Sequence, residues 1–204
     1  MTATKRAFDL IVSVILALLL WPVLIAVIVA LLLLEGRPVF YIAERMRATD
    51  RSFQLIKFRT MAASAANTGV TGGDKNGRMS RFQLLLRRSR ADELPQLWNV
   101  IRGDISLVGP RPPLRVYVEA YPEIYSQVLQ SRPGITGLAS LRFHAHEETI
   151  LATCSSAAET DTAYRQRCIP RKAALDLLYQ KNRTLCFDLK LIGETAVKPF
   201  LRRS

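Results

Sequence analysis

Residues 11–34 read IVSVILALLLWPVLIAVIVALLLL, an apolar run with a proline near its centre. The run carries no charged residue, and Ser13 is its single hydroxyl side chain. It is longer than the roughly 20 residues that a straight helix needs to cross the hydrocarbon core of a bilayer. No small-residue cleavage site closes it, so it is not typical of a signal peptide. Length alone therefore predicts a helix that spans the membrane.

Two features of this run favour a different path through the membrane. Pro22 removes one backbone hydrogen bond and bends a helix. Basic residues also flank the run on both sides, and a Lys/Arg excess is typical of cytoplasmic flanks. These residues are Lys5 and Arg6 before the run, and Arg37, Arg45, Arg47 and Arg51 after it. A spanning helix and a re-entrant helix-break-helix hairpin with both ends in the cytoplasm therefore both stay open.

The composition of the chain indicates an anionic partner. The 204 residues include 29 Lys and Arg against 17 Asp and Glu, which gives a formal net charge of +12. Nucleic acid, phospholipid headgroups and phosphorylated substrates all attract such a chain. The apolar run favours a membrane surface, and we expect no nucleic acid partner because aromatic residues are not interleaved with the basic clusters. Three cysteines without metal-ligand spacing favour a reducing compartment, and two histidines are too few for a multi-histidine metal site.

The rest of the chain predicts an α+β domain with a small β-sheet and short helices. Alternating apolar and polar residues predict strands at 37–46 and 52–61, around a turn at 48–51. The Gly-rich stretch 62–77 predicts a mobile loop. Helices are expected at 80–90, 94–103 and 121–130, and again from about residue 160 onward with a break at Pro170.

Two of these helices are amphipathic, and we expect them at the membrane interface. Arginines surround the apolar side of 80–90, so they can reach lipid phosphates. A solvated basic helix on a soluble core is the alternative. The apolar face of 94–103 consists of Leu94, Leu97, Trp98 and Ile101.

A turn followed by a strand is expected at 132–143, with His144 and His146 alternating at its end. Glu147 and Glu148 follow the two histidines. A metal site is one interpretation of this group, but a polar strand face or a loop end explains it better.

The densest group of reactive side chains lies at 90–112, RADELPQLWNVIRGDISLVGPRP. Asp92 and Glu93 are adjacent carboxylates at the entry of helix 94–103, where the helix dipole is positive and a phosphate can bind. One or two carboxylates plus substrate phosphates are the usual ligands of Mg²⁺. An aspartate can also attack phosphorus and form a covalent acyl phosphate. For an arbitrary Asp-Glu pair, helix capping is the ordinary explanation.

Several basic side chains are candidates for holding a phosphate. Arg111 lies in GPRP (109–112), where prolines on both sides restrict the backbone and prepare the guanidinium for a bidentate contact. Lys57 and Arg59 share one face of the strand 52–61, and Arg132 starts the turn RPGITG. A solvated strand face and an ordinary turn are the alternatives.

Taken in order, these motifs resemble the bacterial sugar transferase family, the small monotopic phosphoglycosyl transferases. They are the apolar N-terminal segment with its proline, KFRTM at 57–61, LRRSRADELPQLWNVIRGDISLVGPRP at 86–112 and RPGITG at 132–137. The resemblance covers nearly the whole chain and is strongest from Arg81 to Gly137. It implies a re-entrant membrane-anchoring hairpin over 1–36, bent at Pro22, and a cytoplasmic catalytic domain over 37–204.

The resemblance also implies a reaction and its partners. Members transfer a sugar phosphate from a nucleoside diphosphate sugar to polyprenol phosphate, and we expect a UDP-sugar and undecaprenyl phosphate here. The transfer releases the nucleoside monophosphate and starts assembly of a polysaccharide or glycoconjugate. The resemblance places the reaction at the cytoplasmic face of the bacterial inner membrane, where the protein contacts the phospholipid, and implies that the reaction uses Mg²⁺. A homodimer is a further expectation.

The resemblance assigns roles to the candidate residues. Asp92 is the nucleophile that forms an aspartyl phosphosugar, and Glu93 assists as a magnesium partner or base, so both form the metal site. Arg87, Arg111 and Lys57 match phosphate-facing residues of the family. Arg59 and Arg132 complete the predicted phosphate-binding set.

Two positions depart from the family pattern. Trp21-Pro22 stands where Ser-Pro is common, and LRFHAHEETILA (141–152) replaces a common GRN motif, so the sugar stays open. No role is assigned to His144, His146, Asp176, Tyr179 or Asp188.

Two other functions are compatible with the same residues. One is a membrane-surface protein that binds anionic lipid without catalysis, and the other is a magnesium-dependent phosphohydrolase. The family reaction favours the hairpin over a single crossing, because a crossing would place Lys5 and Arg6 on the far side of the membrane.

Overall fold

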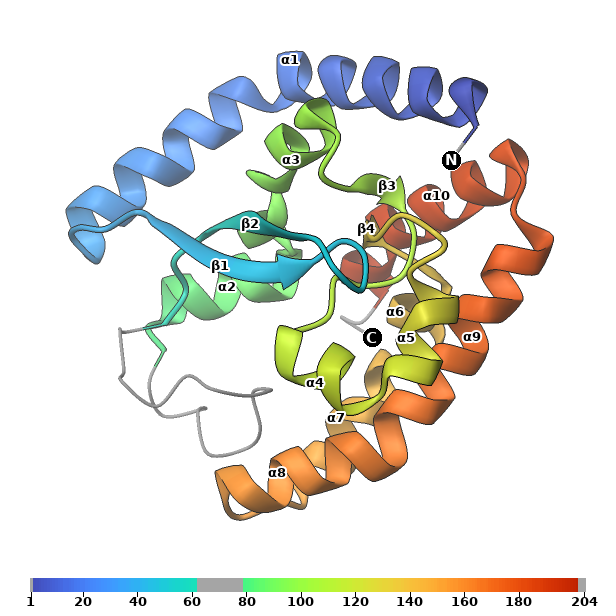
Figure 1. Cartoon of the computed structure of the whole chain (residues 1–204). Helices are drawn as coiled ribbons and strands as arrows, with labels where there is room; N and C mark the ends of the chain where they lie inside the picture. Colours follow the sequence, from blue (N-terminus) through green and yellow to red (C-terminus); the bar gives the residue numbers. More distant parts are fainter. Residues whose placement is uncertain (1, 62–78, 202–204) are drawn as a thin grey trace.

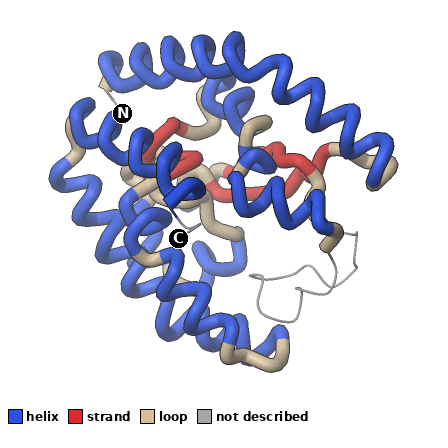
Figure 2. The backbone as a smooth tube through the Cα atoms, turned by 180° about the vertical axis from the view of Figure 1, so that it is seen from behind, coloured by secondary structure: helices blue, strands red, loops and turns tan. Residues whose placement is uncertain are grey.

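The computed structural model describes residues 2–61 and 79–201, with the backbone alone for 198–201. The predicted loop at 62–77 lies outside the described residues. Most of the described chain is helical, and its short strands form two separate two-stranded sheets (Figure 1). The prediction of helices with a small amount of sheet is confirmed at this level, and Figure 2 shows the same arrangement from behind.

The apolar run forms one long helix, α1 (Ala3–Leu34), capped by the side chain of Thr2. Helical structure continues through Pro22, so the predicted break is wrong and a bend takes its place. Figure 1 and Figure 2 both show α1 bending near its middle as it arches over the rest of the molecule. The bend has a local cause, because the proline ring removes one N–H donor and crowds the carbonyl four residues earlier. The neighbouring backbone hydrogen bonds still form, so the helix bends but does not end.

The N-terminal end of α1 is tied to the C-terminal part of the chain by buried charges. Lys5 Nζ lies 2.7 Å from Asp188 Oδ2 of α10 (Leu185–Leu201) and 3.5 Å from Asp9 Oδ1. Ser106 donates a hydrogen bond of 2.7 Å to Asp9 Oδ2. All four residues are buried, so the first turns of α1 are fixed inside the protein.

The C-terminal end of α1 is held by the same body of protein. Its last residues are followed by Glu35, whose carboxylate accepts hydrogen bonds from Ser80 Oγ and from Gln83 Nε2, the latter at 3.0 Å. Arg59 donates to the backbone carbonyls of Glu35 and Gly36 at 2.7 and 3.0 Å. Because α1 begins and ends on one body, its arch is closed at both ends.

The first two strands form the predicted hairpin. β1 (Phe40–Met46) pairs antiparallel with β2 (Ser52–Phe58), with Phe40 opposite Phe58 and Met46 opposite Ser52. β2 buries Phe53 and Leu55 in a core cluster that also contains residues of α3 (Gln96–Arg102). Lys57, which belongs to the site described below, follows Leu55 by two residues and so shares its side of β2.

Helix α3 is present as predicted and ends at Gly103, whose φ of 88° suits a glycine. Its buried face departs from the apolar stripe Leu94, Leu97, Trp98 and Ile101, since Val100 is fully buried whereas Trp98 is 56% exposed. The reason is Asn99, which is also fully buried. Its side chain donates to Gln54 O at 2.8 Å and accepts from Ile56 N at 3.1 Å. These two bonds to β2 fix the rotation of α3 about its axis.

The second sheet pairs β3 (Ser106–Val108) with β4 (Gly134–Thr136) in parallel. The turns beside these strands touch closely, since a Cβ on Gly109 would lie 2.2 Å from the carbonyl oxygen of Arg132. Only glycine fits this approach, which fixes GPRP against RPGITG. The predicted strand after residue 132 is three residues long and is followed directly by α6 (Leu138–Arg142).

The remaining elements are helical. The predicted strand end at His144 and His146 is wrong: both residues lie in α7 (His144–Ala152), because Phe143 before them adopts helical backbone angles. The other elements are α2 (Arg81–Ser89), α4 (Arg115–Ala120), α5 (Pro122–Val128), α8 (Ala157–Ala163), a π-helical turn (Tyr164–Cys168) and α9 (Ile169–Asn182).

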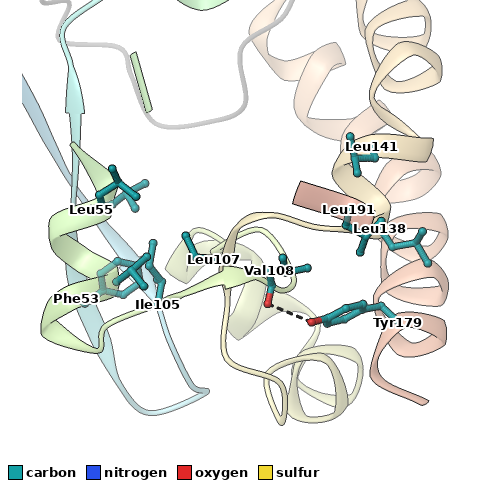
Figure 3. Close-up of a cluster of buried hydrophobic side chains, with 11 residues drawn as sticks. Phe53, Leu55, Ile105, Leu107, Val108, Leu138, Leu141, Tyr179 and Leu191 are labelled. Atoms are coloured by element: carbon teal, nitrogen blue, oxygen red, sulfur yellow. Dashed lines mark hydrogen bonds between the residues drawn. The ribbon is translucent and has the colours of Figure 1, made fainter. Parts of the chain in front are cut away.

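The largest core cluster joins segments that are far apart in the sequence. Val108 of β3 packs there with Leu138 of α6, Leu191 of α10 and Tyr179 of α9 (Figure 3). The Tyr179 hydroxyl lies 3.2 Å from Val108 O and 2.6 Å from Asp188 Oδ1. Apolar residues of the N-terminal half of α1 pack against the same cluster. This half of α1 is therefore part of the packed core.

Replacing Lys5 by methionine is expected to lower the free energy of unfolding by about 3–5 kcal/mol, because two buried carboxylates lose their cation. Urea or thermal denaturation in detergent micelles measures the loss. The double variant Lys5→Met, Asp188→Asn is expected to recover part of it, since one uncompensated charge is removed.

The matched control is Glu194→Gln, because Glu194 lies on α10 as Asp188 does. This variant breaks the ion pair of Glu194 with Arg142, which is more exposed than the Lys5 network. It is expected to cost less than about 1 kcal/mol. Equal losses for Lys5→Met and Glu194→Gln would contradict the structural role of the buried network.

Candidate active site

The predicted dyad lies in a 3₁₀ turn, Ala91–Glu93, between α2 and α3. Arg90 ends α2 in a left-handed conformation with φ of 58°, which is uncommon for a residue other than glycine. Such backbone strain persists only where surrounding contacts hold it, and it is frequent at functional sites. Here it turns the chain so that the side chains of both Asp92 and Glu93 are buried.

Glu93 is the centre of a cluster of cations from three different segments. Its Oε1 lies 3.1 Å from Lys57 Nζ of β2 and 3.0 Å from Arg111 Nη2 of the GPRP turn. Its Oε2 accepts a hydrogen bond of 2.6 Å from Arg90. Both carboxylate oxygens are therefore engaged by cations.

Asp92 differs from its neighbour in having no hydrogen bond or ion pair with any described residue. Its residue is 9% exposed. Burial, followed by the negative charge of Glu93, raises the pKa of Asp92, while Lys57, Arg87 and Arg111 act in the opposite direction. The result is a buried carboxylate in a cationic environment that no described residue pairs directly.

The cations and Glu93 shift each other's pKa values. Burial lowers the pKa of Lys57 to about 8, with Arg111 adding to the effect and Glu93 opposing it. Burial acts to raise the pKa of Glu93, but the charges of Arg111, Lys57 and Arg90 together exceed it and hold that pKa well below the usual range. Glu93 is consequently ionised at neutral pH.

The structure brings together some predicted residues and separates others. Lys57, Arg111, Asp92 and Glu93 form one cluster, and Arg87 is near enough to act on the pKa of Asp92. The Arg87 guanidinium itself lies 3.3 and 3.6 Å from the sulfur atoms of Met79 and Met61.

Arg59 and Arg132 lie apart from this cluster. Arg59, predicted on one strand face with Lys57, directly follows the end of β2 and binds the carbonyls that follow α1. The Arg132 guanidinium lies beside Gly103 together with that of Arg6. Neither residue contacts Asp92 or Glu93 through any bond within the described parts of the chain.

Arg90 is the residue that the site prediction lacks. Its spacing of three residues from Glu93 was a usable signal, because residues three apart in a helical turn face each other. What the spacing could not indicate is the left-handed backbone that aims the guanidinium at Glu93 Oε2.

The predicted magnesium ligands fit only in part. Among the described residues, no group of three or more His, Cys, Asp or Glu side chains converges as a metal site. The unpaired carboxylate of Asp92 suits Mg²⁺, which commonly takes one or two carboxylates plus substrate phosphates. Glu93 fits poorly, since three cations already surround it and would repel a fourth.

Comparison with known proteins places this arrangement in a family. The family model described as "Bacterial sugar transferase" matches residues 1–202. The chain therefore belongs to the bacterial sugar transferase family, which confirms the resemblance found in the motifs.

Several curated relatives are similar over nearly the whole chain. The UDP-glucose:undecaprenyl-phosphate glucose-1-phosphate transferase of Xanthomonas campestris pv. campestris is 32% identical over 95% of this chain and 38% of its own length. The UDP-N-acetylgalactosamine-undecaprenyl-phosphate N-acetylgalactosaminephosphotransferase of Aeromonas hydrophila is 31% identical over 94% of this chain and 42% of its own length. The exopolysaccharide production protein PSS of Rhizobium leguminosarum bv. phaseoli is 33% identical over 97% of this chain and 96% of its own length.

The chain thus spans about two-fifths of the length of the first two relatives and nearly all of the third. The family match over residues 1–202 covers every residue of the site described above.

The Lys57 amine is expected to titrate with a midpoint near pH 8, and Glu93→Gln is expected to lower that midpoint further. The negative charge of Glu93 favours the protonated amine, so its removal leaves burial and Arg111 unopposed. NMR titration of ¹³C-methylated lysines measures the midpoint, and the Lys57→Met variant assigns the signal by its absence. A wild-type midpoint above pH 10 would contradict the cluster as described.

Proposed function

We propose that this protein is a phosphoglycosyl transferase that moves a sugar phosphate from a UDP-sugar to undecaprenyl phosphate. The observation that carries the proposal is the contrast within the dyad: Asp92 is buried and unpaired, while Glu93 beside it binds three cations. A free carboxylate among fixed cations suits attack on a phosphorus centre, whose oxygens the cations can hold. The names of the relatives support the two substrates.

The chemistry consists of two displacements at one phosphorus atom. A carboxylate oxygen of Asp92 attacks the phosphorus that bears the sugar, and the bond from that phosphorus to the nucleoside monophosphate breaks. The nucleoside monophosphate leaves with the bonding electrons. A phosphate oxygen of undecaprenyl phosphate then attacks the same phosphorus, and its bond to Asp92 breaks. The lipid diphosphate sugar forms and the carboxylate is regenerated, so the reaction is of the ping-pong type.

The role proposed for Glu93 is to position cations. Lys57, Arg90 and Arg111 carry like charges from separate segments and would repel one another without the carboxylate between them. With Glu93 ionised, Lys57 and Arg111 stay next to Asp92, where phosphate oxygens of the substrate would lie. Arg87 adds a further positive charge close to Asp92.

Magnesium is proposed as the cofactor of this reaction. Asp92, together with the diphosphate of the donor, would hold it, since Glu93 is surrounded by cations. When bound, the ion neutralises charge on the diphosphate and stabilises the departing nucleoside monophosphate.

The proposed location is the cytoplasmic face of the inner membrane, with α1 as a monotopic anchor. Both ends of α1 are fixed to the same body of protein, which supports a re-entrant path over a straight crossing. The arch between these ends presents uncovered apolar side chains, among them Leu18 and Leu19, each 68% exposed. Trp98 of α3 and Leu85 of α2 are exposed as well. An anchor of this shape keeps the site at headgroup level, where the phosphate of a lipid acceptor lies.

Asp92→Asn is expected to lower sugar phosphate transfer by about three to six orders of magnitude, because the nucleophile is lost. Mixing the wild-type protein with UDP-sugar and Mg²⁺, without undecaprenyl phosphate, should release UMP and add the mass of one sugar phosphate to the protein. Intact-protein mass spectrometry detects the adduct, and EDTA should abolish it.

The matched control is Asp50→Asn, a carboxylate in the exposed turn between β1 and β2, which should form the adduct normally. Full transfer by Asp92→Asn would rule out the covalent mechanism. UMP release without any lipid-linked product would favour a phosphohydrolase, and no release at all would favour a lipid-binding protein.

A cysteine introduced at Ala3 is expected to stay unlabelled in intact cells by a membrane-impermeant maleimide, and to react after the cells are permeabilised. The reason is that both ends of α1 lie on the side of the catalytic residues. Labelling is carried out in a Cys186→Ser background, since Cys154 and Cys168 are buried.

Glu123→Cys, on the exposed side of α5, is the matched reporter for the catalytic domain. Reaction of Ala3→Cys alone in intact cells would contradict the re-entrant path of α1. Reaction of both cysteines would contradict the cytoplasmic orientation while leaving the re-entrant path intact.

A further inference from the structure

A cavity of about 190 Å³ is bounded by α4, α5, α7 and α9. Arg111 lines it and also contacts Glu93 Oε1 at 3.0 Å, so one residue links the cavity to the dyad. A cavity of roughly 150 Å³ is enough to hold benzene. The cavity therefore has room for one six-membered ring, and Arg111 connects this space to the dyad.

Two polar groups line this cavity without a hydrogen-bond partner among the described residues. Asp176 of α9 is 7% exposed, and its Oδ1 accepts no hydrogen bond. Tyr125 of α5 also lines the cavity, and its hydroxyl forms no hydrogen bond with a described residue. Leaving a buried polar group unpaired costs free energy, so the unpaired oxygen of Asp176, together with Tyr125 beside the same cavity, indicates a missing polar ligand.

The other polar groups of the cavity are fixed in place. Lys172 Nζ lies 3.0 and 3.1 Å from the two carboxylate oxygens of Glu147 and 3.3 Å from the Tyr164 hydroxyl. Tyr164 begins the π-helical turn Tyr164–Cys168. Turns of this kind are rare and are frequent at functional sites. The wall is therefore pre-organised, with donors, acceptors and aromatic rings side by side.

We propose that this cavity binds the sugar ring of the donor, and that Asp176 and Tyr125 determine which sugar is accepted. The proposal rests on the transferase function proposed above. A sugar ring carries hydroxyls that donate and accept hydrogen bonds, together with C–H faces that pack on aromatic rings, and the cavity offers partners for each. Burial raises the pKa of Asp176 to about 7, so its carboxyl can both donate and accept near neutral pH.

The position of the cavity favours the sugar over the nucleobase. The sugar is joined through one oxygen to the phosphorus that Asp92 attacks, whereas a second phosphate separates this phosphorus from the nucleoside. Arg111 both lines the cavity and binds Glu93, the neighbour of Asp92, so the cavity is connected to the dyad through one residue. The sugar also stays on the protein through both displacements, which a lined cavity serves better than a flat surface.

The test compares kcat/KM for UMP release among UDP-glucose, UDP-galactose and the two corresponding N-acetylhexosamine donors. In Asp176→Asn the ratios among these donors are expected to change by about tenfold or more, because a pocket that bonds a hydroxyl discriminates strongly against a misplaced one. Tyr125→Phe removes the other unpaired group, keeps the ring, and is expected to shift the same ratios. Melting temperatures confirm that the variants are folded, and either variant alone is sufficient for the test.

Glu123→Gln is the matched control, because it removes a carboxylate from the exposed side of the helix that carries Tyr125. It is expected to leave the ratios unchanged. Equal loss with every donor sugar in Asp176→Asn and Tyr125→Phe would overturn the proposal. A change in preference for the base, measured with thymidine and guanosine diphosphate donors at constant sugar, would also overturn it.

These outcomes differ from a failure of the proposed function. A wild-type protein that releases UMP and forms the lipid product, but whose variants keep all sugar ratios, refutes the sugar pocket alone. A wild-type protein that releases no UMP from any donor refutes both.

Discussion

The attraction between Glu93 and three cations is the interaction on which the site depends. Lys57 comes from a β-hairpin, Arg90 from the end of a helix and Arg111 from a proline-flanked turn. No local propensity brings these segments together, and their charges oppose it. One buried carboxylate compensates all three, so it fixes the distance between the hairpin and the turn. Asp92, the next residue along the chain, is thereby placed among cations while remaining free to react.

Much of the fold could be predicted from local patterns because local physics determines it. The hairpin around 48–51, the end of α3 at Gly103 and the helical C-terminal part all follow from alternation, glycine conformation and periodicity. The buried face of α3 does not follow from local patterns. Asn99 binds the backbone of β2 and sets the rotation of the helix, so the buried side differs from the apolar stripe. A long-range bond to a polar side chain is invisible to periodicity.

The site shows the same division between local and long-range information. Asp92, Glu93, Arg111 and Lys57 were predicted together and lie together, since their motifs are dense and rigid. Arg59 shares a strand face with Lys57 in sequence, yet it binds the carbonyls after α1 because that helix end lies within its reach. Arg132 lies beside Gly103 and Arg6 because the close approach of Gly109 to its backbone sets its direction. Alternation predicts on which side of a strand a side chain lies, but not which group that side chain binds.

The pairing of Lys5 with Asp188 has a consequence for biogenesis. The two residues are 183 positions apart, so the lysine leaves the ribosome long before its partner exists. Until then the beginning of α1 carries a charge without a buried counter-ion, and the apolar arch is free of the body that later closes it. Long-range contacts of this kind form late and slowly. At the proposed membrane location, insertion of α1 into the lipid and closure of the arch are therefore separate events in time, and closure can take place only after Asp188 has been synthesised.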